Sequence, residues 1–219
     1  MVGALHGAVK LNIRFVKLPL MPKVSDEHRL AQRDRIQHAA IAVARRKGVQ
    51  AATMAEIIAE SGLSAGAIYG YYASKDDLIL DLAQTVLGSR IGIAEGLLGL
   101  PEVPPPAVAM QVLMRDLPED WLAGGLMLQF WGVAAADDRM REAALELGHT
   151  MIMVMERYLT AWYHHGGADV DQAAAMAGKA TPAMLALAQG YIMQRSIGLL
   201  TDFTPYGEAI EQLVGNAPR

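Results

Sequence analysis

Three helix starts follow one another closely in this chain, and their spacing constrains the fold more than any other feature. Thr53 can cap a first helix, because Glu56 follows three residues later and completes a capping box. Ser64 can cap a second helix, and Ser74 a third. Gly62 lies between the first two helices, where a helix that ends in a left-handed residue favours glycine. This spacing is typical of a helix-turn-helix motif and the helix that follows it.

The middle helix is short and lacks the apolar stripe of a core helix. Its small and aromatic residues are Ser64, Ala65, Gly66, Tyr69 and Tyr71. A short helix with small residues at its front and tyrosines along one side is suited to lie in a DNA groove. The segment therefore predicts a DNA-binding surface.

Phosphate and base contacts are expected from different residues of this segment. We expect phosphate contacts from Thr53, Ser64, Tyr69 and Lys75, and approach to base edges by Ser64, Ala65, Gly66 and Tyr71. Hydroxyls at helix starts lie beside free N–H groups that favour anions. A cation in a first helical turn opposes the helix dipole, which a nearby phosphate would explain for Lys75. The short helix carries no Arg or Lys, so close backbone approach and DNA shape should matter more than guanine readout.

The pattern Ser64-x-Gly66-x-x-Tyr69-x-Tyr71-Tyr72-x-Ser74-Lys75-x-x-Leu78 resembles the DNA-binding signature of TetR-family transcriptional regulators. The resemblance spans roughly residues 33–82. Gly70 and Ile58 depart from the family's usual residues, which bears on the base contacts and on the crossing of the second and third helices. The resemblance implies an all-α fold, with an amino-terminal three-helix helix-turn-helix domain and a larger helical domain for ligand binding and dimerisation.

The implied function is that of a DNA-binding transcriptional regulator, a homodimeric repressor that a hydrophobic small molecule releases from a near-palindromic operator in double-stranded DNA. The alternative is a helical DNA-binding regulator without a small-molecule inducer. We expect no enzyme, no catalytic residue and no cofactor, because no paired carboxylates or nucleophile–base set occur at a workable spacing. Residues 62–66 match G-x-S-x-G, but helical residues precede them where a nucleophile elbow needs a strand.

The charge distribution agrees with one DNA-facing part. Residues 1–75 hold 11 Lys and Arg against 5 Asp and Glu, a net charge of +6, whereas the remaining residues carry −10 and bring the total to −4. A basic first third on an acidic remainder favours a domain that meets nucleic acid and another that meets something else.

The chain is expected to consist of three parts. These are a loosely ordered extension over residues 1–22, the helix-turn-helix domain over 23–73, and the ligand-binding and dimerisation domain over 74–219. The helices are expected at about 25–47, 74–98, 107–116, 120–135, 138–165, 171–200 and 206–214, besides the two short ones of the motif. Pro182 would either restart or kink the last long helix. The absence of cysteine and of a long apolar run fits a cytoplasmic protein without a membrane span.

Methionine and aromatic residues crowd the second domain. Such side chains form a core more often than a pocket, but the resemblance implies an inducer cavity, and methionine adapts to ligands of varied shape. The candidate ligand-binding residues are Met110, Met114, Met127, Phe130, Trp131, Met155, Trp162 and Tyr191, and polar contacts are expected from Gln129, Arg157 and Gln194.

Two further patterns concern assembly and flexibility. The run Met151–Met155 is apolar on every face of a helix, which indicates cover by a second subunit and predicts a dimer through residues 138–165 and 183–200. Gly88, Gly92 and Gly96 lie on one face of the helix at 74–98, where they serve either close packing or a compliant connector. Adjacent His164 and His165 point to different faces, so we expect no metal site.

Overall fold

The computed structural model describes residues 26–115, 117, 119–122, 125–200 and 202–214, and over these residues the fold is entirely helical. The helices are α1 (Asp26–Lys47), α2 (Met54–Ser61), α3 (Ala65–Tyr69), α4 (Lys75–Leu98), α5 (Pro106–Met114), α6 (Glu119–Leu122), α7 (Leu126–Ala136), α8 (Asp138–His165), α9 (Val170–Ser196) and α10 (Thr204–Leu213). The all-α class is thereby confirmed. The expected extension over residues 1–22 lies outside the described residues. Within the described residues no helix has both the length and the apolarity to cross a membrane.

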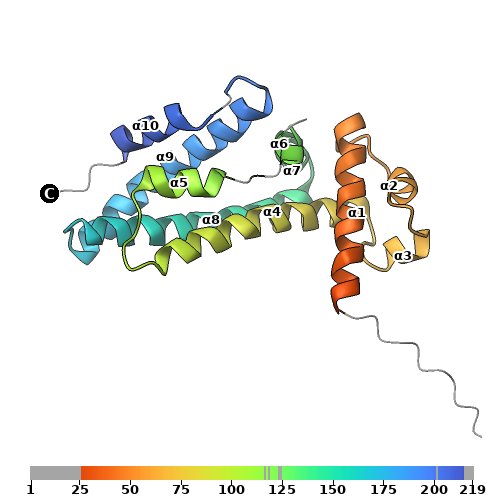
Figure 1. Ribbon diagram of the computed structural model, residues 1–219, viewed down its shortest axis with the longest axis horizontal. Coiled ribbons are helices and arrows are strands. Elements are labelled where there is room, and N and C mark those ends of the chain that lie inside the picture. Colours follow the sequence, from red (N-terminus) through yellow and green to blue (C-terminus); the bar gives the residue numbers. More distant parts are fainter. Residues whose placement is uncertain (1–25, 116, 118, 123–124, 201, 215–219) are drawn as a thin grey trace, which may run out of the picture.

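The molecule has two ends that α4 joins (Figure 1). Helices α1, α2 and α3 form one end, and at the other α4 runs beside α8 with α5, α9 and α10 on one side of this pair. Helices α8 and α9 pack along each other as the most extensive helix pair, and α4 packs on α8.

The caps predicted for the starts of the three closely spaced helices α2, α3 and α4 are present. The Thr53 hydroxyl accepts from the Glu56 N–H at 3.3 Å, and the Glu56 carboxylate accepts from the Thr53 N–H at 3.2 Å. The Ser64 hydroxyl accepts from the Ala67 N–H at 3.2 Å, and the Ser74 hydroxyl accepts from the Asp77 N–H, three residues later, at 3.1 Å. Local side-chain chemistry therefore sets where α2, α3 and α4 begin.

In the second domain one expected helix is divided into two, and one open alternative is decided. The helix expected at 120–135 is two helices, α6 and α7, because Gly125 adopts a left-handed conformation with φ 63° between them. Helix α9 continues through Pro182, and the preceding Thr181 hydroxyl donates to the Ala177 carbonyl at 2.9 Å. The open question of a restarted helix is thus resolved in favour of a continuous one.

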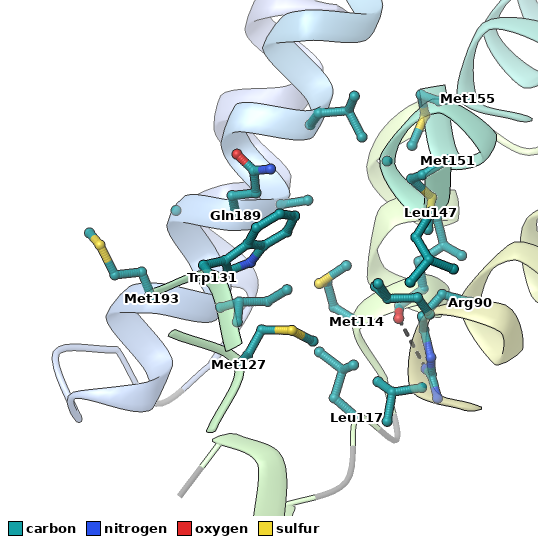
Figure 2. A pocket seen from close by; sticks show the side chains of 18 of the residues that line it. Arg90, Met114, Leu117, Met127, Trp131, Leu147, Met151, Met155, Gln189 and Met193 are labelled. Carbon is teal, nitrogen blue, oxygen red and sulfur yellow. Dashed lines mark hydrogen bonds between the residues drawn. The ribbon is translucent and has the colours of Figure 1, made fainter. Parts of the chain in front are cut away.

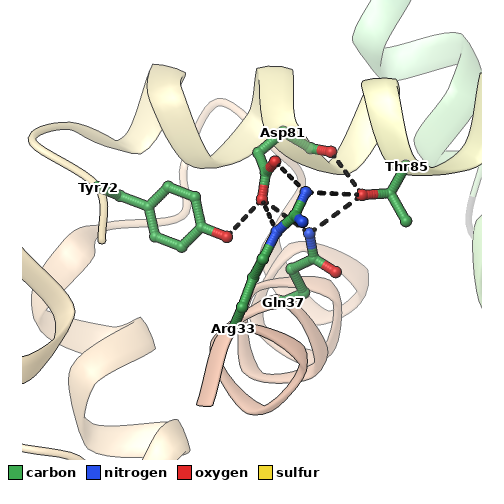
Figure 3. A network of polar contacts seen from close by, with 5 residues as sticks. All are labelled: Arg33, Gln37, Tyr72, Asp81 and Thr85. Atoms are coloured by element: carbon green, nitrogen blue, oxygen red, sulfur yellow. Dashed lines mark hydrogen bonds and ion pairs between the residues drawn. The ribbon is translucent and has the colours of Figure 1, made fainter. Parts of the chain in front are cut away.

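A polar network centred on Asp81 fastens α4 to α1 (Figure 3). Arg33 of α1 forms an ion pair with the Asp81 carboxylate, and Gln37 of the same helix donates to it at 2.8 Å. The Tyr72 hydroxyl, from the segment between α3 and α4, donates at 2.5 Å. The first two turns of α4 are therefore fixed to the end formed by α1, α2 and α3, where the sequence predicts DNA binding.

The network also shifts the pKa values of Asp81 and Tyr72. Burial alone would raise the pKa of Asp81, but hydrogen bonds from Arg33, Tyr72 and Gln37 outweigh it and lower this pKa below its ordinary value. Burial and the neighbouring carboxylate raise the pKa of the Tyr72 hydroxyl, so it stays a donor.

We predict that Asp81→Asn lowers the free energy of unfolding by about 2 kcal/mol at pH 7, because charge-assisted hydrogen bonds from three partners weaken together. The folded-state pKa of Asp81 is lowered, so its contribution is present above the unfolded value of about 3.9 and is lost as the pH falls through the folded value. Urea unfolding at pH 7 and in steps below pH 4 measures both effects. The exposed Glu142→Gln on α8 is the matched control, and an equal loss in both variants would contradict the role of Asp81.

Candidate DNA interface and ligand cavity

The DNA-binding candidates lie together on α2, α3 and the turns that flank them. Thr53, Ser64, Ala65 and Gly66 are exposed, and Tyr69 is 52% exposed. Ile68, which is fully buried, anchors the short α3 to the core of this end. The surface thus presents the small residues and one large aromatic side chain to the outside, as a groove-binding helix requires.

The two adjacent tyrosines have different surroundings. Tyr72 is buried and holds Asp81, whereas Tyr71 is half-buried with its ring centroid 6.4 Å from that of Tyr72. Tyr72 therefore supports the fold, and Tyr71 keeps one side available for contact.

Lys75 has partners within the chain. Its ammonium donates to the carbonyls of Val49 and Gln50, at 3.2 and 2.8 Å. These carbonyls lie just after the end of α1, so the lysine ties the α1–α2 turn to the first turn of α4. This role explains a cation in a first helical turn without a phosphate, and contact of Lys75 with DNA stays a prediction.

Ion pairs fix α2 against the basic end of α1. Lys47 pairs with Glu56, and Arg46 with Glu60. The Lys47 ammonium and the Thr53 hydroxyl lower the pKa of Glu56, and Arg46 lowers that of Glu60. Both carboxylates stay ionised near neutral pH, so part of the positive charge of α1 orients α2.

A cavity of about 480 Å³ lies between α4, α5, α7, α8 and α9 (Figure 2). Its walls are mainly methionine, leucine and other apolar side chains. The lining residues are Val86, Leu87, Arg90, Met110, Leu113, Met114, Leu117, Met127, Leu128, Trp131, Leu147, Gly148, Met151, Ile152, Met155, Leu185, Ala188, Gln189, Gly190, Ile192 and Met193. A volume and lining of this kind suit a small apolar molecule.

Five of the eight predicted ligand residues line this cavity. These are Met110, Met114, Met127, Trp131 and Met155. The other three face elsewhere. Phe130 is buried against α4 and α8, Trp162 packs beside Tyr163, and Tyr191 makes edge contacts with the rings of Phe203 and Tyr206.

The polar residues expected near a ligand do not line this cavity. Gln129 turns to the α1–α2 turn, Arg157 pairs with Glu95 on the surface, and neither they nor Gln194 line the cavity. The polar lining residues are Arg90 and Gln189. Arg90 lies one turn after Val86 and Leu87, so the helical period of α4 could have identified it.

Arg90 is engaged at the cavity wall. Its guanidinium donates to the carbonyls of Leu113 and Arg115, at 3.1 and 2.7 Å. A cation at these carbonyls stabilises the carboxyl end of α5 and ties it to α4. Arg90 thereby joins these two helices at the cavity wall.

The three glycines of α4 are exposed, and a Cβ atom placed on Gly88, Gly92 or Gly96 would meet no heavy atom within 4 Å. They therefore do not serve close packing within this chain. Each reduces helix stability by about 0.5–1 kcal/mol relative to alanine, which makes the middle of α4 easier to bend.

Comparisons with known proteins point to one family. A model of the family described as bacterial regulatory proteins, tetR family, matches residues 36–82. An uncharacterised HTH-type transcriptional regulator of Bacillus subtilis strain 168, YfiR, is 35% identical over 78 residues. That match covers 36% of this chain and 35% of the relative, so it spans about a third of the curated protein's length.

Solved structures extend the likeness over the whole fold. A proposed transcriptional regulator of Pseudomonas aeruginosa PAO1 has a TM-score of 0.68 at 21% identity, over 88% of this chain and 91% of that one. A TetR transcription regulator of Haloarcula marismortui ATCC 43049 gives 0.62 at 16% identity, over 85% and 95%. Salmonella enterica GusR gives 0.61 at 19% identity, over 89% and 100%. At these identities the likeness shows the fold.

We predict that Gly66→Ala weakens DNA binding by about tenfold or more, because a methyl group would separate the α3 backbone from DNA. Within the protein the methyl has open space, and alanine favours a helix by about 0.5–1 kcal/mol, so stability should not fall. Mobility-shift titration and thermal unfolding measure the two effects. Gly178→Ala adds the same methyl to an exposed position of α9, outside the proposed DNA-binding surface, and serves as the control. Equal DNA affinity in wild type and Gly66→Ala would exclude close backbone approach at this residue.

Proposed function

Because the chain belongs to the TetR family of bacterial transcriptional regulators, we propose that it is a homodimeric repressor released from DNA by a mainly apolar small molecule. The observation that carries the proposal is the presence, in one chain, of an exposed helix-turn-helix and a 480 Å³ apolar cavity that share α4. This family is a class of DNA-binding regulators and not of enzymes.

The ligand class follows from the cavity walls. Methionine, leucine and isoleucine supply most of the lining, and no acidic side chain is among the lining residues. A ligand with a large apolar body would gain from burial there, at about 25 cal/mol for each Å² withdrawn from water. Gln189, on the α9 side, offers an amide to one polar group of the ligand. The cavity favours this function over that of a regulator without an inducer.

A second copy of the chain is proposed to cover the outer faces of α8 and α9. Met153 on α8 is 57% exposed and Ile197, at the end of α9, is 60% exposed. Leu145 on α8 and Leu199, three residues after α9, are exposed as well. Apolar side chains repeated along two neighbouring helices support a four-helix contact between subunits. A two-fold dimer would set two α3 helices about 34–36 Å apart or somewhat more, on a near-palindromic operator.

Selection of a duplex from a random DNA library with the full-length protein tests the DNA half of the proposal. A thermal-shift screen of apolar compounds tests the ligand half, and the compounds that raise the unfolding temperature are then added to the protein–DNA complex. The proposal expects a palindromic consensus and at least one compound that releases the duplex. Binding of DNA without release by any stabilising compound would favour the regulator without an inducer.

We predict that Met153→Glu converts the dimer to a monomer at micromolar concentration, because a buried charge in an apolar contact carries a large desolvation cost. Light scattering measures the change. Leu213→Glu on α10, where the leucine is 69% exposed, places the same charge on another apolar surface residue and should leave the dimer intact. A monomeric wild type would contradict the proposed assembly.

We also predict that Gly92→Ala blunts release from DNA while ligand affinity in the absence of DNA is unchanged. The alanine meets no neighbouring atom, so its effect is to stiffen α4 by about 0.5–1 kcal/mol. The measurement is the amount of a stabilising compound that releases half of the bound duplex. Release at the same concentration as in wild type would show that α4 need not bend at this residue.

A further inference from the structure

Helix α7 contacts both the cavity and the DNA-binding end, through opposite faces. Met127, Leu128 and Trp131 line the cavity. Leu126 and Phe130, on the other face, border a small space with residues of α1 and α4. Leu126 and Met127 also belong to the same buried cluster as the core of α1, α2 and α3. A displacement of the cavity face of α7 would therefore alter the packing of the core formed with α1, α2 and α3.

A hydrogen bond adds direction to this contact. The Gln129 side-chain oxygen of α7 accepts from the Val49 N–H at 2.7 Å. Val49 is buried in the α1–α2 turn, four residues before the Thr53 cap of α2. Gly48, next to it, has φ 89°, and a Cβ atom there would lie 3.2 Å from the Gln129 oxygen. The absence of a side chain at Gly48 lets α7 reach this peptide group.

The same peptide segment is held from its other side. Lys75, in the first turn of α4, donates to the carbonyls of Val49 and Gln50. The turn that leads into α2 thus has one attachment to α7 and one to α4. The Asp81 network makes the beginning of α4 part of the DNA-binding end, so the Lys75 attachment lies within that end. The Gln129 attachment comes from a helix that lines the cavity.

We propose that Gln129 couples occupancy of the cavity to the position of α2 and α3, by fixing the Val49 peptide to α7. This inference rests on the proposed function and assigns the route of its regulation. A ligand that displaces Met127 or Trp131 moves α7, and the bond to Val49 carries that movement to the α1–α2 turn. Gln129 is a positioning residue, which touches neither the ligand nor DNA.

The experiment exploits the absence of cysteine from the chain. Ala188→Cys places a single thiol on the cavity wall contributed by α9, and labelling with N-(1-naphthyl)maleimide puts a tethered apolar group in the cavity. Affinity for the library-selected duplex is measured with and without the label. The same measurements are made with Gln129→Asn, whose amide is too short to reach Val49, and with Gln129→Glu, which keeps an acceptor at full length. Labelled Glu208→Cys on α10, outside the cavity, is the control for the label.

The expected result is a loss of DNA affinity on labelling, of about 5–150-fold as for typical allosteric couplings, when Gln129 is intact. Gln129→Asn should reduce this loss to less than about threefold, and Gln129→Glu should largely restore it. The ratio of labelled to unlabelled affinity isolates coupling from any general change in DNA binding or stability. Gln129→Met, a weak acceptor of similar length, repeats the test if thermal unfolding shows that the asparagine variant is not folded.

The two ways of failing are distinguishable. An equal loss on labelling in the Gln129→Asn and parent proteins would overturn the role of Gln129 and leave the proposed function standing. No loss on labelling with Gln129 intact would overturn both, because the cavity would then have no influence on DNA binding.

Discussion

The arrangement of the two ends depends on the hydrogen bonds of one group, the carboxylate of Asp81. It receives bonds from two side chains of α1 and from Tyr72, which precedes α4. Without it, α4 would meet α1 mainly through apolar contacts, which have no direction and tolerate rotation. With it, the orientation of α4 fixes that of α1, and α1 carries α2 through the Lys47 and Arg46 ion pairs. A change in the direction of α4 is therefore expected to move α1, α2 and α3 together.

The location of the flexible part of α4 follows from the same constraint. The Asp81 network ends at Thr85, to which Arg33 and Gln37 also reach at 3.4 and 3.3 Å. The three glycines lie beyond it on the exposed side, and Arg90, between Gly88 and Gly92, ties α4 to the end of α5. A rigid segment attached to the DNA-binding end thus adjoins a segment attached to the cavity wall. Bending between them is least costly where glycine removes side-chain restriction.

The sequence predicts what local chemistry determines. The caps at Thr53, Ser64 and Ser74 depend on residues within three positions, so the helix starts were correct to within a residue or two. Side-chain direction across helices depends on packing that no local pattern records. Phe130 and Trp131 are neighbours in sequence and equally plausible as ligand contacts, yet α7 turns one to the core and the other to the cavity. The roles of Lys75 and Gln129 could not be predicted from the sequence. Both depend on the position of Val49, a residue that no sequence motif connects with either.

The energetics of the cavity make coupling through such small contacts reasonable. Every 100 Å² of apolar ligand surface withdrawn from water contributes about 2.5 kcal/mol. A shift between two conformations requires only the difference in ligand affinity between them, typically about 1–3 kcal/mol. Methionine side chains line several walls, and because they adapt their shape at low cost, a ligand gains contact in both conformations. Selectivity for one conformation must then come from the less adaptable Trp131 ring on α7. The same helix holds the α1–α2 turn through Gln129, so this rigid part of the cavity wall is also connected to the DNA-binding end.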